Sequence, residues 1–117
     1  MLTSPAGLCP EPRSGACRYA GLVIRVRLAL VQVNPVVGDL DGNAERIRRV
    51  LDKVDGCDLA VFGEMALTGY PLEDLVLKPG FVADSRAALE KVAGASGDCA
   101  LGIGFADGDE DVVYNAV

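Results

Sequence analysis

The sequence predicts an α/β fold, on three observations. Short apolar runs rich in β-branched residues alternate with segments whose apolar residues recur at helical spacing. The resulting order is strand, helix, strand, helix, strand, strand, which is typical of a parallel sheet with crossover helices. The chain has 117 residues, half of them hydrophobic, so it has the length of one domain at most and enough apolar material for a core.

The first half of the sequence contains two predicted strands and one predicted helix. Residues 25–33 form a nearly continuous apolar run, which predicts a central strand that ends before Pro35. Apolar residues then recur at helical spacing over 44–54, and Gly56 marks the end of this helix. Residues 58–63 predict the second strand.

The second half continues the same alternation. Residues 72–77 predict one short helical turn, and residues 81–92 predict a second amphipathic helix. Residues 99–105 predict a third strand, 107–111 a turn, and 112–117 the start of a fourth strand. Because a helix separates each of the first three strands from the next, these three strands are predicted to be parallel.

The two ends of the sequence differ from the region between them. Residues 1–22 contain Pro, Gly and Ser and lack periodicity, which predicts either a disordered leader or a misassigned start, since a valine codon near Val23 can serve as a start. The last predicted strand has no cap or polar tail after it, so residues 23–117 are expected to be an incomplete domain.

Composition excludes several classes of function. The net charge of −6 argues against nucleic acid or an anionic membrane surface as a partner. No apolar run approaches the roughly 20 residues that span a bilayer, and the leader lacks the apolar core of a secretory signal. These features predict a cytoplasmic protein. Histidine is absent, which removes catalytic triads and zinc sites that need it.

The four cysteines show no C-x-x-C spacing, so neither a zinc ribbon nor a thioredoxin-like redox pair is predicted. Cys57 and Cys99 flank predicted strands and are expected to be small buried hydrophobes in a reducing compartment. A disulfide between Cys9 and Cys17 is expected only if the chain is exported.

Glu64 is the strongest candidate for chemistry. It follows the apolar run 59–62, and turn-forming residues come soon after it. In open α/β sheets, ligand crevices lie outside the carboxyl ends of the strands, where Glu64 is predicted to stand. A lone acid at the end of a buried strand needs a partner or a task.

Two acidic runs imitate calcium loops but fail the pattern. A calcium loop has glycine at its sixth position. The run that contains Asp107, Asp109 and Asp111 has no glycine at that position, and neither has the run that begins with Asp39 and Asp41. These acids are predicted to form turns and helix caps, and no metal is expected.

Four segments occur in order along the chain: Leu-Ala-Leu-Val-Gln-Val-Asn-Pro (28–35), Val-Gly-Asp-Leu-Asp-Gly-Asn (37–43), Phe-Gly-Glu-Met-Ala-Leu-Thr-Gly-Tyr-Pro-Leu-Glu-Asp-Leu (62–75) and Val-Tyr-Asn-Ala (113–116). Together they resemble the nitrilase, or carbon–nitrogen hydrolase, superfamily. Within that superfamily, Gly-Tyr-Pro-Leu-Glu-Asp-Leu at 69–75 is similar to the amino-terminal glutaminase domain of glutamine-dependent NAD synthetases. The resemblance implies a partial nitrilase-type α-β-β-α sandwich, about the first half of the domain, with a mixed sheet and flanking helices.

The resemblance also implies a Glu-Lys-Cys triad. Glu64 matches the family glutamate, the general base that takes the proton of the nucleophilic cysteine, a role that partial burial of a carboxylate favours. The family lysine follows the Tyr-Asn-Ala segment and the cysteine comes later still, so both are expected beyond Val117, and none of the four cysteines of this chain corresponds to the nucleophile.

Three further positions carry specific expectations. Gly63 stands where the family usually has proline, a change expected to loosen the backbone before Glu64. Tyr70 is either a substrate-pocket residue or a turn aromatic packed on the sheet, and both interpretations stay open. Tyr114 is expected in the core.

The function implied by the resemblance is that of an amino-terminal fragment of a glutamine-hydrolysing NAD synthetase. The small-molecule substrate is glutamine, the parent enzyme is expected to be a homo-oligomer, and ATP and magnesium are expected only in its synthetase domain, with no cofactor in this fragment. The fragment itself is expected to be inactive. Two alternatives stay open, namely a fragment of a stand-alone amidase or carbamoylase, and a non-catalytic remnant.

Overall fold

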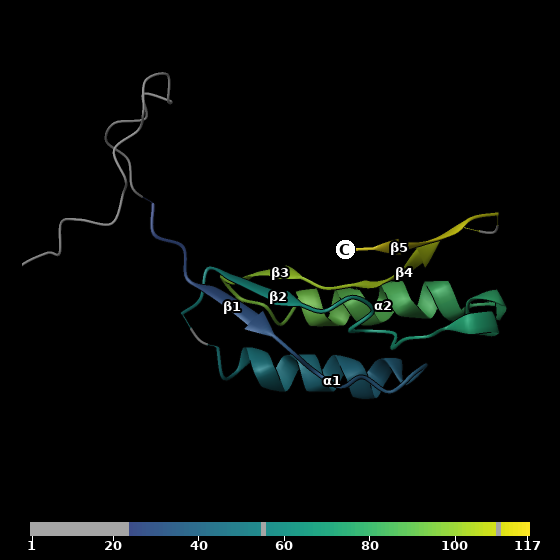
Figure 1. Cartoon of the computed structure of the whole chain (residues 1–117), viewed down its shortest axis with the longest axis horizontal. Helices are drawn as coiled ribbons and strands as arrows, with labels where there is room; N and C mark the ends of the chain where they lie inside the picture. Colours follow the sequence, from purple (N-terminus) through teal and green to yellow (C-terminus); the bar gives the residue numbers. More distant parts are fainter. Residues whose placement is uncertain (1–23, 55, 110) are drawn as a thin grey trace, which may run out of the picture.

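The computed structural model describes residues 24–54, 56–109 and 111–117, and its elements follow the predicted order as far as β3 (Figure 1). The prediction for residues 1–22 lies outside the described residues. Five strands, two α-helices and one 3₁₀ helix are present in the described part: β1 Leu28–Val31, α1 Leu40–Leu51, β2 Leu59–Phe62, η1 Glu73–Leu77, α2 Phe81–Ala93, β3 Ala100–Gly102, β4 Phe105–Gly108 and β5 Val113–Ala116.

Strands β1, β2 and β3 form a parallel sheet in the order β1-β2-β3, which confirms the predicted direction of the first three strands. Leu28 pairs with Leu59, and Leu59 pairs with Ala100. The central strand is therefore β2. The prediction that residues 25–33 form a central strand was wrong, because no described strand pairs with the outer edge of β1.

The predicted third strand, 99–105, is two strands in the structure. The ladder with β2 ends at Gly102, and the chain then leaves the parallel sheet and forms an antiparallel hairpin of β4 and β5. Asp107 and Gly108 belong to β4, so the predicted turn over 107–111 begins two residues too early. Parallel and antiparallel pairing are thus divided between two sheets, where a single mixed sheet was expected.

Both α-helices lie against the same face of the parallel sheet (Figure 1). Ala60 and Phe62 of β2 point toward them and are buried, together with Ile47 of α1 and Val92 of α2. Burial of these apolar side chains is the main contribution to stability, at about 25 cal/mol per Å² removed from water. The described residues thus form a sheet with helices on one face, and the full α-β-β-α sandwich stays a prediction.

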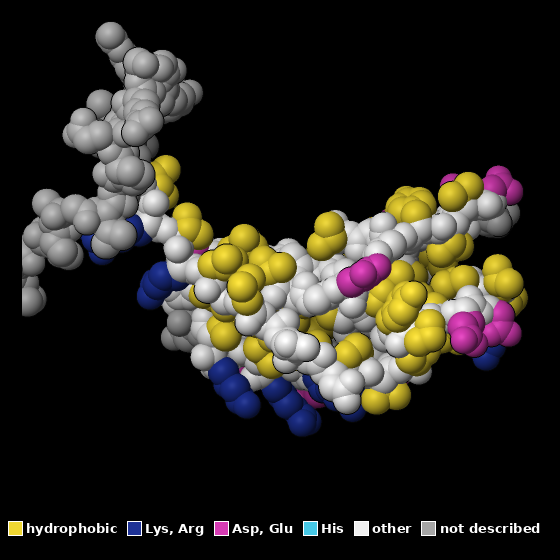
Figure 2. Space-filling model, in the orientation of Figure 1, with side chains coloured by type: hydrophobic (Ala, Val, Ile, Leu, Met, Phe, Trp, Pro, Cys, Tyr) yellow, Lys and Arg dark blue, Asp and Glu magenta, His cyan; other side chains and the backbone are white. Residues whose placement is uncertain are grey.

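The opposite face of the sheet is open. Leu28 and Leu30 of β1 are 53% and 78% exposed, and Val26 and Ile24 continue the same apolar surface toward the amino terminus. Figure 2 shows this patch as a cluster of hydrophobic side chains over β1. Basic side chains of α1 lie on the other side of the molecule, where Arg48 and Arg49 pair with Glu45.

Helix α1 begins four residues before the predicted helix because Asp39 caps it. The Asp39 carboxylate accepts a hydrogen bond from the Gly42 backbone N–H at 3.0 Å, which satisfies one of the free donors at the helix start. This observation confirms that Asp39 is a helix cap. Arg48 and Arg49 lie in the last turn, where cations are favoured by the helix dipole.

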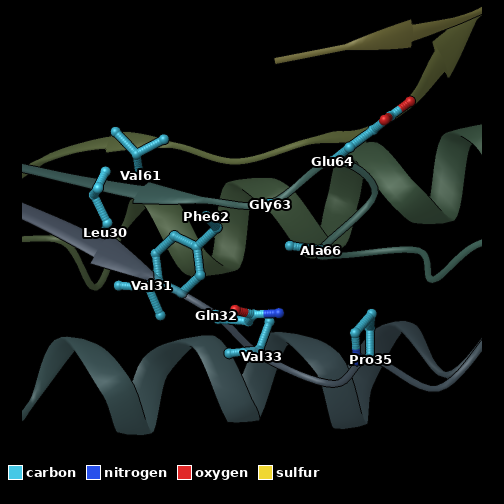
Figure 3. Close-up of a pocket in the computed structure, with 10 residues that line it drawn as sticks. All are labelled: Leu30, Val31, Gln32, Val33, Pro35, Val61, Phe62, Gly63, Glu64 and Ala66. Atoms are coloured by element: carbon cyan, nitrogen blue, oxygen red, sulfur yellow. The ribbon is translucent and has the colours of Figure 1, made fainter.

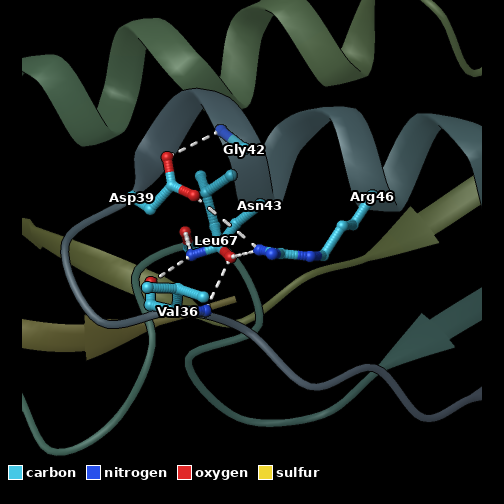
Figure 4. A network of polar contacts seen from close by, with 6 residues as sticks. All are labelled: Val36, Asp39, Gly42, Asn43, Arg46 and Leu67. Carbon is cyan, nitrogen blue, oxygen red and sulfur yellow. Dashed lines mark hydrogen bonds and ion pairs between the residues drawn. The ribbon is translucent and has the colours of Figure 1, made fainter.

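Asn43, in the first part of α1, is 1% exposed and uses every hydrogen-bonding position of its amide (Figure 4). Its Nδ2 donates to the carbonyl oxygens of Val36, at 2.7 Å, and Leu67, at 2.9 Å. Its Oδ1 accepts from the Val36 N–H and from Arg46, both at 2.8 Å. One side chain therefore holds the loop after β1 and the loop after β2 against α1.

No helix within the described ranges is long and apolar enough to cross a membrane.

Replacing Asn43 by Ala is expected to lower the free energy of unfolding by about 2–4 kcal/mol, because the Val36 and Leu67 backbone groups lose buried partners. Urea denaturation monitored by circular dichroism measures this change. Arg46→Ala, which removes the part-buried contact of Arg46 with the same amide and an exposed ion pair with Asp39, is the control and is expected to change stability by less than about 1 kcal/mol. Equal effects of the two variants would contradict the prediction.

The ion pair between Arg86 on α2 and Asp107 on β4 is expected to make stability depend on pH in the acid range. The hydrogen bond from Arg86 lowers the pKa of Asp107 in the folded chain, so the pair stabilises the fold above the unfolded-state pKa, about 4, and this contribution is lost as the pH falls through the folded-state pKa. Arg86→Gln is therefore expected to be less stable than the original chain near about pH 7, with a difference that shrinks toward about pH 2.

The measurement is the urea midpoint across this pH range, with Asp107→Asn as the matched variant that removes the same titration. A difference that stays constant from neutral to acid pH would argue against a role for this pair.

Candidate active site

An open groove of about 510 Å³ lies at the carboxyl ends of β1 and β2 (Figure 3). Glu64 is on its rim, two residues after the end of β2, as the sequence predicted. The remaining lining is mostly apolar and comes from the ends of the two strands and the segments that follow them: Leu30, Val31, Gln32, Val33, Pro35, Val61, Phe62, Gly63 and Ala66. Among the described residues that line the groove, Glu64 is the single ionisable one.

The loop after β2 is held in a tight conformation that aims Glu64. The Ala66 N–H donates to the Gly63 carbonyl at 3.2 Å, and Met65 adopts a positive φ of 53°. A positive φ is uncommon for a residue with a side chain and persists only where surrounding contacts enforce it. The loop continues into the segment that Asn43 holds through the Leu67 carbonyl.

Gly104, between β3 and β4, supplies one of those contacts. A Cβ atom on Gly104 would lie 2.5 Å from the Met65 nitrogen and 2.9 Å from the Glu64 Cα. The Gly104 carbonyl also accepts a hydrogen bond from the Leu67 N–H at 3.2 Å. The glycine therefore allows two backbone segments to touch directly beneath Glu64, a reason for glycine at this position that the sequence alone did not indicate.

The Glu64 carboxylate meets Asn115 of β5. Its Oε1 accepts a hydrogen bond from Asn115 Nδ2 at 2.6 Å. In Figure 3 the Glu64 side chain points away from Phe62 and Val31, toward the strand that passes above the loop. Sequence reasoning did not assign a site role to Asn115, although it lies within the Val-Tyr-Asn-Ala segment that carries part of the resemblance.

Two expectations about burial near this site were wrong. Glu64 is exposed in the described chain, because no described element covers the open side of the groove, whereas partial burial was expected. Tyr114 is 52% exposed and not in the core, because β5 is paired on only one edge and packs weakly on the rest of the fold.

Tyr70 does not join Glu64 in this groove. It is 73% exposed and lies outside the groove lining. The packed turn aromatic that was one interpretation does not match this exposure, and the substrate-binding role of Tyr70 stays a prediction.

Gly63 is unconstrained by its surroundings. Its φ is not in the left-handed region, and no atom lies within 4 Å of the position that a Cβ would occupy. The structure therefore has room for a Cβ atom at this position.

Of the acidic run set aside as a calcium loop, Asp109 forms a turn as predicted, whereas Asp107 lies in β4 and pairs with Arg86. The Asp109 carboxylate accepts backbone hydrogen bonds from Asp111 and Val112, both at 3.0 Å, which closes the turn between β4 and β5. These two hydrogen bonds lower the pKa of Asp109. Among the residues that the structure describes, no group of three or more acidic or cysteine side chains is arranged to hold a metal ion.

Chemically, the groove provides one carboxylate able to accept a proton, an amide that orients it, and an apolar floor. The described lysines and cysteines do not line it. Cys57 and Cys99 lie at the amino-terminal ends of β2 and β3, the ends opposite to Glu64. The described lining thus offers a carboxylate that can accept a proton, without a thiol or an amine beside it.

Comparison with known proteins gives one consistent result, although no family model matches the sequence. The chain is 45% identical over 95 residues to the glutamine-dependent NAD(+) synthetase of Rhodobacter capsulatus and 41% identical over 96 residues to that of Thermotoga maritima, each match covering 79% of the chain. It is 39% identical over 93 residues to the same enzyme of Xylella fastidiosa. These matches cover 16–17% of the length of the relatives, so the chain spans about one sixth of them.

Solved structures agree with these matches. A glutamine-dependent NAD(+) synthetase from Cytophaga hutchinsonii superposes with a TM-score of 0.72 at 21% identity, over 77% of this chain and 16% of that one, which supports the fold. The glutamine-dependent NAD+ synthetase of Acinetobacter baumannii, solved in complex with adenosine diphosphate, superposes with a TM-score of 0.62 at 29% identity, over 77% of this chain and 18% of that one.

Gly104→Ala is expected to destabilise the chain by about 1–3 kcal/mol, because the added methyl group pushes the backbone at Glu64 and Met65 away. Gly63→Ala, one residue from Glu64 but in open space, is the matched control and is expected to be neutral or to stabilise by up to about 1 kcal/mol. Urea midpoints of the two variants measure the difference. If both substitutions had the same effect, the close approach at Gly104 would have no energetic role.

Proposed function

Because the chain is a homologue of the amino-terminal region of glutamine-dependent NAD(+) synthetases, we propose that it forms the first part of a glutaminase domain and supplies its general base. One observation carries this proposal. Glu64 stands at the carboxyl end of the central strand, on the rim of an apolar groove, with its carboxylate held by Asn115 at 2.6 Å.

In the proposed reaction, the Glu64 carboxylate takes the proton of a cysteine thiol. The thiolate then attacks the side-chain amide carbon of glutamine, and the proton passes to the departing ammonia as a thioester forms. Water next hydrolyses the thioester, with the same carboxylate as base, and glutamate leaves. By resemblance to the family, the cysteine and the lysine that stabilises the oxyanion follow Val117 in the complete enzyme.

Asn115 has a defined part in this proposal. Its side-chain N–H donates to Oε1 of Glu64, so one carboxylate oxygen is occupied and the other is left to accept the thiol proton. The Asn115 amide thereby limits the rotation of a side chain that is otherwise exposed. Asn115 acts as a positioning residue and Glu64 as the catalytic one.

The same proposal covers the activity of the whole enzyme, by resemblance to the family. The ammonia released from glutamine would be used, with ATP and magnesium at a separate synthetase domain, to convert deamido-NAD to NAD. A homo-oligomeric, cytoplasmic enzyme is part of the same proposal.

The test measures glutamate released from glutamine by two proteins, the 117-residue chain and the product of the complete gene. The chain alone is expected to release none. In the complete gene product, Glu64→Gln is expected to lower kcat/KM by about 10³-fold or more, since a general base contributes about 10²–10⁴-fold and the nucleophile depends on it. Asn115→Ala is expected to lower kcat by about 10-fold with little change in KM, because it affects the aim of the base and not the binding of substrate.

Glu73→Gln, which changes an exposed carboxylate outside the groove, is the control and is expected to keep activity within about twofold. Full activity of the complete gene product carrying Glu64→Gln would refute the role of Glu64. Glutamine turnover by the 117-residue chain, abolished by Glu64→Gln, would refute the expected inactivity of the chain alone.

A further inference from the structure

Cys57 and Cys99, 42 residues apart in sequence, lie with their Sγ atoms 3.0 Å from each other. The register of the sheet brings them together. Leu59 pairs with Ala100, and the Ala100 N–H donates to the Asp58 carbonyl at 3.0 Å, so the residues that precede β2 and β3 lie side by side. The contact is therefore fixed by backbone pairing and does not depend on one side-chain rotamer alone.

The surroundings of the two thiols differ from the expectation that they are buried hydrophobes. Both cysteines are only partly buried. A surface cavity of about 280 Å³ adjoins them, lined by both cysteines and by residues of the loops that follow α1 and α2. The position of a Cβ on Gly56 lies 3.1 Å from Nη1 of Arg27, so a guanidinium stands beside the residue next to Cys57. A small thiol reagent has access to this cavity, whose lining also includes the carboxylates of Asp52 and Asp98.

We propose that Cys57 and Cys99 form a reversible disulfide when the chain meets a small-molecule disulfide oxidant such as oxidised glutathione. The Sγ atoms need to approach from 3.0 Å to about 2.05 Å, a movement within the reach of side-chain rotation. This site lies at the ends of the strands opposite to Glu64, so the inference does not depend on the proposed function.

The chemistry balances as two thiol–disulfide exchanges. The thiolate of one cysteine of the pair attacks one sulfur of the oxidised glutathione, its S–S bond breaks, and one reduced glutathione leaves. The thiolate of the other cysteine then attacks the sulfur of the first cysteine in the mixed disulfide and releases the second glutathione. The two cysteines together lose two protons and two electrons, and the glutathione disulfide gains them.

The hydrogen bond with Cys57, followed by partial burial, raises the pKa of Cys99. Either thiolate can attack first, because each sulfur lies within reach of the other. A metal site at the same place is disfavoured, since no third acidic or cysteine ligand is grouped with the pair among the described residues.

The disulfide would join the residues that precede β2 and β3, and β3 is the shortest strand of the parallel sheet. Strand β3 has three residues, and the segment closed by the bond contains β2, the Glu64 loop and α2. Closing a loop of this length restricts the unfolded chain strongly. Oxidation is therefore expected to raise the Tm of the chain by about 5–15 °C without occupying the groove.

The experiment uses the full chain carrying Cys9→Ser and Cys17→Ser, so that only the pair remains. The folded protein is equilibrated with oxidised and reduced glutathione and quenched with acid. Intact mass and peptide mapping then report the state of each thiol. The expected result is an intramolecular link between the peptides of Cys57 and Cys99, reversed by dithiothreitol, together with the rise in Tm.

Cys57→Ser and Cys99→Ser in the same background are matched controls, each expected to end as a single glutathione adduct or a free thiol with no rise in Tm. Peptide mapping of the original chain repeats the test without substitutions, and the urea-unfolded chain shows whether pairing requires the fold. Separate glutathione adducts on both cysteines, intermolecular dimers, persistent free thiols, or equal pairing in the unfolded chain would each overturn the proposal.

Discussion

The buried amide of Asn43 is the interaction on which the arrangement of the groove depends. A helix, the loop after β1 and the loop after β2 meet at this side chain, which makes four hydrogen bonds there. A backbone hydrogen bond from the Gly38 N–H to the Thr68 carbonyl also joins the two loops. A buried amide is tolerated only when its donors and acceptors are all matched, which restricts both loops to positions that match them. The precise shape of the groove mouth follows from that restriction.

The contact between Glu64 and Asn115 depends on a second set of restrictions. Asn115 lies on a hairpin that is separate from the parallel sheet, so its position relative to Glu64 requires the hairpin to be anchored. Gly104 provides one anchor by direct backbone contact with the Glu64 loop. The ion pair between Arg86 on α2 and Asp107 on β4 provides another. The hydrogen bond between Glu64 and Asn115, which are 51 residues apart, therefore depends on these other contacts.

Features that depend on contacts between residues close in sequence were predicted, and features that depend on contacts between distant residues were not. Helical and strand periodicity are local, so α2 and the parallel strands were predicted well, and Glu64 at a strand end followed from them. The break of the third strand at Gly104, the pairing of Asn115 with Glu64 and the approach of Cys57 to Cys99 all depend on contacts between distant segments. No pattern within a single strand or helix indicates such contacts, and glycine at a close approach looks the same in sequence as glycine in a turn.

Glu64 and the open face of the sheet are exposed for the same reason, which is that no described element covers either of them. Leu30 and Val61 line the same groove as Glu64, and Leu30 is 78% exposed. A carboxylate in contact with water is well solvated and is a weak base toward a thiol, whereas a carboxylate beside covered apolar side chains is a stronger one. Any element that packs on Leu30 and Val61 therefore also removes water from Glu64. The described chain thus sets the position of the proposed base through backbone contacts, and its open face leaves that carboxylate in contact with water.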